Sequence, residues 1–198
     1  MASSVSICSA ALVGLGKTPI SSFGDSGALA QACAILYPDE RDSLLRSHPW
    51  NCATKRALLA PLSDAPVFGY GAAFPLPSDF LRLLSVGDRW VFDGPFSNGY
   101  RGYKIEGRNI LSAGTSLRLS YIFKNDVEAT WDSHLVSLMT QRMKWKLCYL
   151  VTASTSLQQQ LAEEYERMAR QARASDAQEG ESETLGGDDT YGYLQGRY

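Results

Sequence analysis

Histidine and paired cysteines are scarce in this sequence, which limits the metal chemistry open to it. Only two of the 198 residues are histidines, and the four cysteines, Cys8, Cys33, Cys52 and Cys148, include no CxxC pair. A structural zinc site would therefore lack ligands at the usual spacing, and we expect no metal and no other cofactor. Cys8, Cys33 and Cys148 lie in apolar stretches, so we expect reduced, buried thiols in a protein made in a reducing cytoplasm.

Long apolar runs and a surplus of positive charge are also missing. No stretch reaches ~18 apolar residues, and the start of the chain has no basic residues and is interrupted by Ser and Gly. We therefore expect neither a membrane span nor a secretory signal. The net charge of −2 argues against a dedicated nucleic-acid binder. The charge is uneven, because residues 176–189 hold six acids and no base, which leaves most of the preceding chain mildly basic.

Residues 3–16 are typical of a helix, with apolar side chains at three- and four-residue steps. Ser3 or Ser4 is placed to cap its start, and Gly14 with Gly16 to end it. A loop rich in Ser and Gly follows.

A second helix is expected from near Ser26 to about Ser47. Pro38 should kink or divide it, because proline lacks the N–H group and clashes with the preceding turn. The helix should end before Pro49, because residues that precede proline avoid helical angles.

The central part of the chain, residues 50–121, has frequent Gly and Pro between short apolar or alternating runs, which predicts strands and turns. One run is an exception, because Ser78 or Asp79 could cap a short helix that carries Phe80, Leu83 and Leu84. The expected strands are "CATKRALLA", "RWVFD", "YKIEG", "NILSA" and "SLRLSYIF".

Helical periodicity returns from Asp132 and continues to about Ala174. The run Ser154-Thr155-Ser156 interrupts it, and Ser156 with Gln159 forms a capping-box pattern that would restart the helix. The end of the chain is rich in Gly, Asp, Glu and Ser, a composition that predicts disorder.

These patterns predict an α+β fold in which the terminal helices pack as a bundle and the middle forms a small antiparallel β domain. The expected divisions are residues 1–49 and 126–175 for the bundle, 50–125 for the β-rich domain, and 176–198 for an extended acidic tail.

The stretch "ALVGLGKT" fits the permissive form of the phosphate-loop pattern, ending in Gly16-Lys17-Thr18. A phosphate loop follows a buried strand and opens a helix, whereas here a helical pattern precedes the glycines and Pro19 follows at once. Asp93, at the end of "WVFD", imitates the magnesium-binding acid but precedes a Gly-Pro turn. We therefore interpret the segment as a helix C-terminus.

Other candidate chemistry is weak. His48 has no nucleophile partner in a suitable setting, and we interpret it as a structural histidine in a tight turn. Glu163 and Glu164 could act as acid or base, but Arg167 and Arg170 follow at helical spacing, which favours a solvated or inter-subunit charged face.

Arg142, Lys144 and Lys146 surround Trp145, and bases beside an aromatic residue can bind nucleic acid. On a helix these side chains point in several directions. Contact with DNA, contact with a partner protein and plain solvation therefore all stay open.

Three stretches of the chain together resemble one family. The first two are "YPDERDSLLRSHPWNCATKRALLAP" and "FGYGAAFPLPSDFLRLL", and the third starts with "LSYIFKNDVEATWDSHLV". The most specific pieces are Arg41-Asp42, His48-Pro49-Trp50-Asn51 and Leu76-Pro77-Ser78-Asp79. Over roughly residues 4–178 the sequence resembles the tail tubular protein A family of short-tailed bacteriophages. Cys52 stands where that family usually has an aromatic residue.

The resemblance implies an assembly protein of the virion with no catalytic residues, assembled in the host cytoplasm. Members of the family form a ring, usually of twelve copies, which joins the portal protein to the tail nozzle, tail tubular protein B, and often binds tail fibres. The ring continues the channel through which double-stranded DNA leaves the capsid. Twelve copies of a subunit with charge −2 carry −24, which opposes adhesion of the passing DNA.

On this interpretation, three sets of residues become candidate interfaces. The aromatic-bearing tail is expected to dock on a neighbouring subunit or the portal, with added strand pairing. The sets are Tyr191, Tyr193, Leu194 and Tyr198 of the tail, Glu163, Glu164, Arg167 and Arg170 of the last helix, and Arg142, Lys144 and Lys146 for channel or partner contact.

Three alternative functions also stay open. They are a nucleotide-binding enzyme that uses Gly16-Lys17-Thr18, a tail-associated cell-wall hydrolase, and a DNA-binding module.

Overall fold

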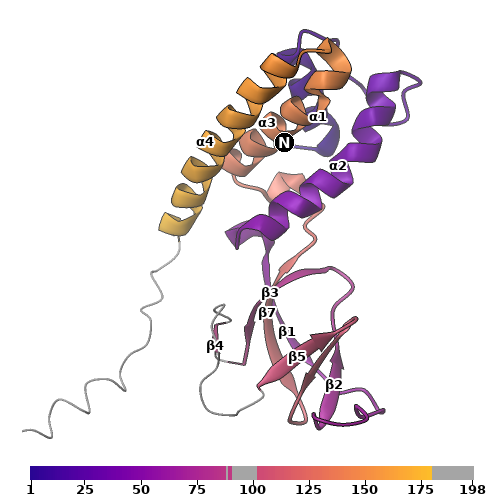
Figure 1. Ribbon diagram of the computed structural model, residues 1–198, viewed down its shortest axis with the longest axis vertical. Coiled ribbons are helices and arrows are strands. Elements are labelled where there is room, and N and C mark those ends of the chain that lie inside the picture. Colours follow the sequence, from indigo (N-terminus) through magenta and orange to yellow (C-terminus); the bar gives the residue numbers. More distant parts are fainter. Residues whose placement is uncertain (88, 91–101, 180–198) are drawn as a thin grey trace, which may run out of the picture.

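The computed structural model describes residues 1–87, 89–90 and 102–179. A helical bundle and a β domain lie end to end along the long axis of the molecule, joined by a narrow neck (Figure 1). The expected α+β class is confirmed. The helices are α1 (Ser4–Gly14), α2 (Ala28–Ser47), α3 (Ser133–Thr152) and α4 (Thr155–Glu179), and short 3₁₀ turns lie at Asn51–Ala53 and Glu128–Thr130.

Helix α1 begins and ends where the sequence predicts. Ser3 and Ser6 form a reciprocal capping box, in which each backbone N–H donates to the other residue's hydroxyl. At the far end Gly16 has φ 74°, and the Lys17 N–H donates back to the Leu12 carbonyl at 3.0 Å. Glycine suits this left-handed position, which closes the helix and satisfies its last carbonyls.

Helix α2 runs from Ala28 to Ser47 with Pro38 inside it, so the proline does not divide the helix. The helix ends as predicted, because His48 takes an extended conformation before Pro49.

Helices α3 and α4 form a hairpin in which the predicted restart is displaced. Ala153 turns the chain with φ 52°, and the Ser154 hydroxyl accepts the Leu157 N–H at 3.2 Å, so Ser154 caps α4 and the Ser156 box does not. The helix also continues to Glu179, beyond the predicted end at residue 174.

The β domain consists of two antiparallel sheets with strand orders β1-β7-β3-β4 and β2-β6-β5. Alternate residues of the long central strand β7 point into the small core, where Leu117, Leu119 and Tyr121 are buried. The described strands are β1 (Thr54–Leu59), β2 (Ala72–Pro75), β3 (Phe80–Val86), β4 (Arg89–Trp90), β5 (Tyr103–Glu106), β6 (Asn109–Ser112) and β7 (Leu117–Phe123).

The predicted helix at residues 80–86 is wrong, because this segment is strand β3. Its pairing with β7 slips at two places, between Phe80 and Arg82 and between Leu83 and Ser85. Each irregularity adds a residue and shifts the apolar spacing from two toward three, which imitates the helical period. Asp79 caps no helix and instead holds Lys55 at 2.8 Å and the Tyr121 hydroxyl at 3.0 Å.

Strand β2 was not predicted, whereas the strands around residues 54–59, 103–106, 109–112 and 117–123 are confirmed. Of the expected strand "RWVFD" only Arg89 and Trp90 lie within the described residues.

The buried apolar residues form two clusters, and the cluster of the bundle also includes Leu84 of β3 and Ile122 of β7. The bundle buries Tyr37, Trp50, Leu138 and Met139 among its helices, and the β domain buries a smaller cluster around Phe74 and Ile110. The four cysteines are free, and Cys8, Cys33 and Cys148 are buried as expected.

Candidate functional site

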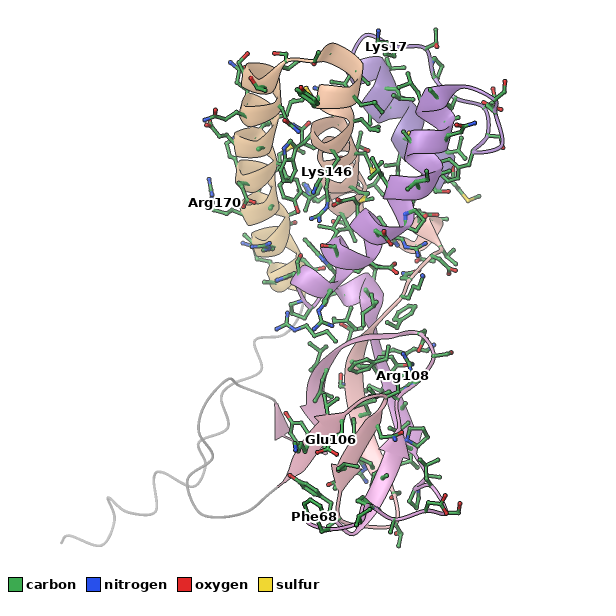
Figure 2. All side chains as sticks on the ribbon, turned by 45° about the vertical axis from the view of Figure 1, so that its right-hand side comes forward. Lys17, Phe68, Glu106, Arg108, Lys146 and Arg170 are labelled. Carbon is green, nitrogen blue, oxygen red and sulfur yellow. The ribbon has the colours of Figure 1, made fainter. Side chains whose placement is uncertain are left out.

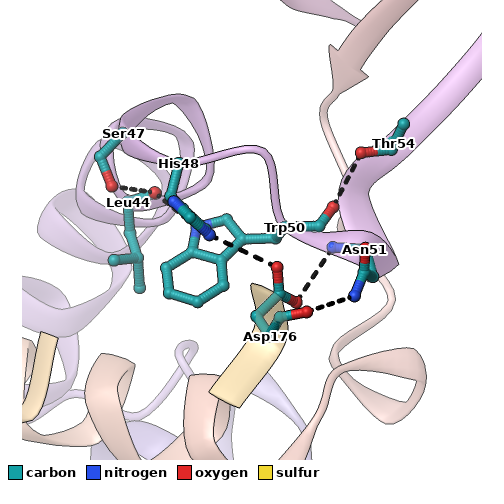
Figure 3. Close-up of polar contacts among 7 residues, drawn as sticks. All are labelled: Leu44, Ser47, His48, Trp50, Asn51, Thr54 and Asp176. Carbon is teal, nitrogen blue, oxygen red and sulfur yellow. Dashed lines mark hydrogen bonds and ion pairs between the residues drawn. The ribbon is translucent and has the colours of Figure 1, made fainter. Parts of the chain in front are cut away.

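The neck is built on Trp50, which lies between the end of α2 and the start of β1. Its indole N–H donates to the Leu44 carbonyl at 3.1 Å, and its own carbonyl accepts the Thr54 hydroxyl at 3.0 Å (Figure 3). The ring is 2% exposed and packs edge-on against His48. The indole therefore fixes the direction in which the chain leaves the bundle.

The last turns of α4 clamp this neck. Asp176 accepts the Asn51 backbone N–H at 3.1 Å, and the Asn51 amide donates to the Asp176 carbonyl at 2.9 Å (Figure 3). The second carboxylate oxygen lies 3.4 Å from His48 Nε2. Sequence analysis placed Asp176 in the acidic tail, and the structure places it inside a helix, buried against the neck.

Burial lowers the pKa of His48, Asp176 opposes that effect, and the positive charges of Arg173 and Arg82 lower the pKa further. His48 is therefore a neutral packing residue at neutral pH, in line with its interpretation as structural. Among the possible nucleophiles near it, the Ser47 hydroxyl donates to the Leu44 carbonyl.

A second crossing of the neck joins β7 to α3. The buried Asn125 amide donates to the Cys52 carbonyl at 2.7 Å and to the Thr130 hydroxyl at 2.9 Å, which ties the two crossings together. Close by, the Tyr37 hydroxyl donates to Glu128 at 3.0 Å, and burial raises the pKa of this tyrosine. These buried groups are satisfied by one another, which makes the joint rigid.

The basic segment of α3 is largely occupied inside the bundle. Arg142 contacts Glu40 at 2.6 Å and donates to Tyr165 and Ser43, and Lys146 lies 2.9 Å from the other Glu40 oxygen. Burial by itself raises the pKa of Glu40, but its hydrogen bonds to Lys146 and Arg142 and their charges lower it. The predicted channel or partner contact rests chiefly on the third base of this set.

That third base, Lys144, is half-buried and has no carboxylate partner in the described part of the chain. Its side chain lies along α1 beside Gly14, where an added Cβ would come within 3.2 Å of Lys144 Cε. A side chain at position 14 would therefore displace the end of Lys144 by a few tenths of an ångström.

The charged face of α4 differs from its prediction in one respect. Glu163 and Glu164 accept hydrogen bonds from Gln159 and Gln141, and no arginine of the described residues donates to them. Arg167 and Arg170 are exposed, and the described residues offer them no ion pair. Both arginines are therefore free to bind something outside the subunit.

The phosphate-loop pattern lies at the end of the bundle, where Figure 2 labels Lys17. A helix precedes it, and the backbone N–H groups of Gly16 and Lys17 donate back into that helix. These donors are consequently unavailable to a phosphate group, and no helix opens at Thr18. The interpretation as a helix C-terminus is confirmed.

Sequence reasoning missed the exposed apolar residues at the two ends of the molecule. At the tip of the β domain Val67 is 97% and Phe68 85% exposed, and Figure 2 shows Phe68 at the extremity. A groove of about 760 Å³ lies beside them, bordered by residues 62–70 and by strands β5 and β6. At the opposite end Val13, Tyr149 and Leu150 are each more than half exposed. A Pro- and Gly-rich loop that carries Val67-Phe68 was the only available signal.

Metal binding and membrane insertion can be examined in the described residues. Within the described ranges no group of three His, Cys, Asp or Glu side chains could hold a metal ion, and none of their helices is long and apolar enough to cross a membrane.

No protein-family model and no curated protein matches this sequence. The tail residues Tyr191, Tyr193, Leu194 and Tyr198 lie outside the described residues.

Proposed function

We propose that this chain is a structural adaptor of a phage tail, which forms a ring between the portal and the tail nozzle and acts without catalysis. The observation that carries the proposal is the pair of exposed apolar patches at opposite ends of an elongated subunit. Exposed apolar groups gathered in this way mark surfaces that bind other proteins. An adaptor needs two such surfaces facing opposite ways, and the rigid neck keeps them in register.

The flanks of the bundle suit the lateral contacts of a ring. Helices α2 and α4 lie on opposite sides of the bundle in Figure 1. The exposed face of α4 presents Arg167 and Arg170, and the exposed face of α2 presents Ile35 and Asp39. Contact between these unlike faces of successive copies is heterologous, which is the kind of interface that closes into a ring. The family resemblance sets the expected number of copies at twelve.

The proposed DNA channel needs no residues that bind DNA specifically. DNA that slides through should meet a surface without strong phosphate binding, and the net negative charge of each subunit meets this need. Tail fibres are a further expected partner through the resemblance alone.

Electron microscopy of the purified full chain, alone and mixed with the portal and nozzle proteins of the same phage, tests the proposal. We expect rings for the native chain and no rings for the double variant Arg167→Glu with Arg170→Glu. A compensating Asp39→Arg change should restore lateral contact in part. A native chain that stays monomeric alone and with both proteins would contradict the proposal.

The two ends are tested separately. We expect Val67→Ser with Phe68→Ser to leave rings intact but to abolish capture of one neighbouring component, and Tyr149→Ser with Leu150→Ser to abolish capture of the other. Val127→Ser is the matched control, because Val127 is also half exposed but lies near the neck. Equal losses in the control would show that apolar exposure at the ends has no special role.

A further inference from the structure

Three arginines lie at the neck, and the described residues offer none of them a carboxylate partner. Arg46 donates to the Leu81 carbonyl, and Arg82 donates to the Arg46 carbonyl at 3.3 Å, so within the described residues both hydrogen bonds go to backbone oxygen. Arg173 has a buried Nε with no hydrogen-bond partner. We call Arg46, Arg82 and Arg173 the neck arginines. They stand apart from Arg41, Arg142 and Lys146, each of which lies within 3 Å of a carboxylate.

Arg82 contacts Arg46 directly, and Arg173 belongs to the last turns of α4. The positive charges of Arg173 and Arg82 both act on His48, which itself lies 3.4 Å from Asp176. In the four-stranded sheet, Arg56 of β1 lies across β7 from Ser85 of β3, because both residues pair with Ser120. Arg56 is exposed and adds a further positive charge on the strand that leaves the neck.

One carboxylate already occupies this basic surface. Asp176 is the first of the six acids between residues 176 and 189, and it binds the neck through Asn51 and His48. The remaining five acids follow directly, with no base among them. Segment 180–189 begins where α4 ends and, at no more than ~3.6 Å per residue, its last residue reaches at most about 36 Å from Glu179.

We propose that the acidic segment 180–189 docks in its own chain on the neck arginines and covers them. A tethered segment acts at an effective concentration of about millimolar, which favours this occupant over a free polyanion. Carboxylate–guanidinium pairs are the strong charge-assisted kind, and a carboxylate beside Arg173 would supply the counter-charge that the described residues do not. Docking would shield this basic surface from the phosphates of nucleic acid.

Carbodiimide coupling tests the contact directly. In the full-length Arg82→Lys variant at low salt, we expect amide links between the introduced amine and Glu181, Glu183, Asp188 or Asp189, mapped by mass spectrometry. A mixture of ¹⁵N-labelled and unlabelled chains should give links only within chains of one isotope.

The matched control is Arg170→Lys, because Arg170 is exposed, has no ion pair among the described residues and lies nine residues, about 14 Å, before Glu179 on the same helix. Equal coupling in this control would mean random collision of the tail. Links between isotopes would place the segment on a neighbouring copy. Either result, or the absence of links, would overturn the proposal.

A binding measurement covers the case in which Arg82→Lys disturbs the neck. Neutralising the segment with Glu181→Gln, Glu183→Gln, Asp188→Asn and Asp189→Asn should tighten binding of a 20-nucleotide single-stranded DNA about tenfold at low salt. Adding Arg46→Gln and Arg82→Gln should remove that gain.

The control for net charge removes four exposed acids elsewhere, with Asp39→Asn, Asp64→Asn, Glu163→Gln and Glu166→Gln. We expect this control to change DNA binding less than twofold. A gain equal to that of the tail variant would show that overall charge alone is responsible and would overturn the proposal. Because these measurements use the free protein, they succeed or fail independently of ring formation.

Discussion

The helical bundle and the β domain treat their apolar and charged groups differently. The bundle encloses large side chains such as Tyr37 and Trp50, and it places Glu40 between two bases at low exposure. The β domain has a smaller core and leaves Leu58, Val67 and other apolar residues in solvent. Exposed apolar area that a domain does not cover itself is available for binding. The bundle thus holds the larger core, and both regions leave apolar surface uncovered at their outer ends, at Tyr149 and Leu150 in the bundle and at Val67 and Phe68 in the β domain.

The largest expected effect on stability is at Trp50, in the core of the bundle. Trp50→Ala removes a buried ring and its hydrogen bond to Leu44, and should lower the free energy of unfolding by about 3–5 kcal/mol. Phe68→Ala removes an exposed ring and should change it by less than about 0.5 kcal/mol. Urea denaturation measures both. Similar losses for the two variants would mean that the exposed loop packs in solution.

The next effect compares two ion pairs. Glu40→Gln leaves Arg142 and Lys146 without their counter-charge where Glu40 is only 14% exposed, so we expect a loss of about 2–3 kcal/mol, below the range for fully buried pairs. Glu106→Gln in the β domain breaks a pair with Lys104 in which both side chains are more than half exposed, and should cost less than about 1 kcal/mol. Thermal unfolding distinguishes the two, and equal costs would contradict the difference in burial.

A smaller effect is expected at the boundary between the regions. Asp176→Ala removes the carboxylate contacts to Asn51 and His48 and should cost about 1–2 kcal/mol. Hydrogen exchange should rise locally at residues 48–53 and in the last turns of α4, while α1 and α3 keep their protection. Uniform deprotection of the whole bundle would instead indicate that the clamp supports global stability.

The smallest effect is a dependence on pH. The folded chain lowers the pKa of His48, so the unfolded chain takes up the proton at higher pH, and stability should fall as pH drops below about 6.5. His48→Gln should flatten the curve between pH 7 and 5.5. Glu40 contributes in a separate window, because its lowered pKa removes stability only below about 4.5. A curve for His48→Gln that matches the native curve would contradict the assignment.

Local signals in the sequence predicted the elements whose ends are determined locally. The capping box at Ser3 and the glycine that closes α1 need only a few neighbouring residues, and both are confirmed. Strand β3 was missed because its irregular pairing with β7, a partner more than 30 residues away, changes the apolar period. Such pairing is invisible to a window of local sequence.

The candidate site was predicted less well, for a related reason. Asp176 was assigned to a disordered tail because acids dominate that stretch, although its burial depends on Asn51, 125 residues earlier. Arg142 and Lys146 looked available because Glu40, on a different helix, neutralises them. Long-range partners decide what a charged residue does, and single-sequence patterns do not contain them.

The joint between the two regions has three supports: the Trp50 crossing, the Asn125 crossing, and the end of α4 through Asp176. Two contacts alone would still allow the bundle and the β domain to rotate about the line that joins them. The third contact opposes that rotation. A force applied at Phe68 would therefore rotate the subunit as one body and would not bend it at the neck. In the proposed ring, a tilt of the subunits at one rim would therefore move the other rim.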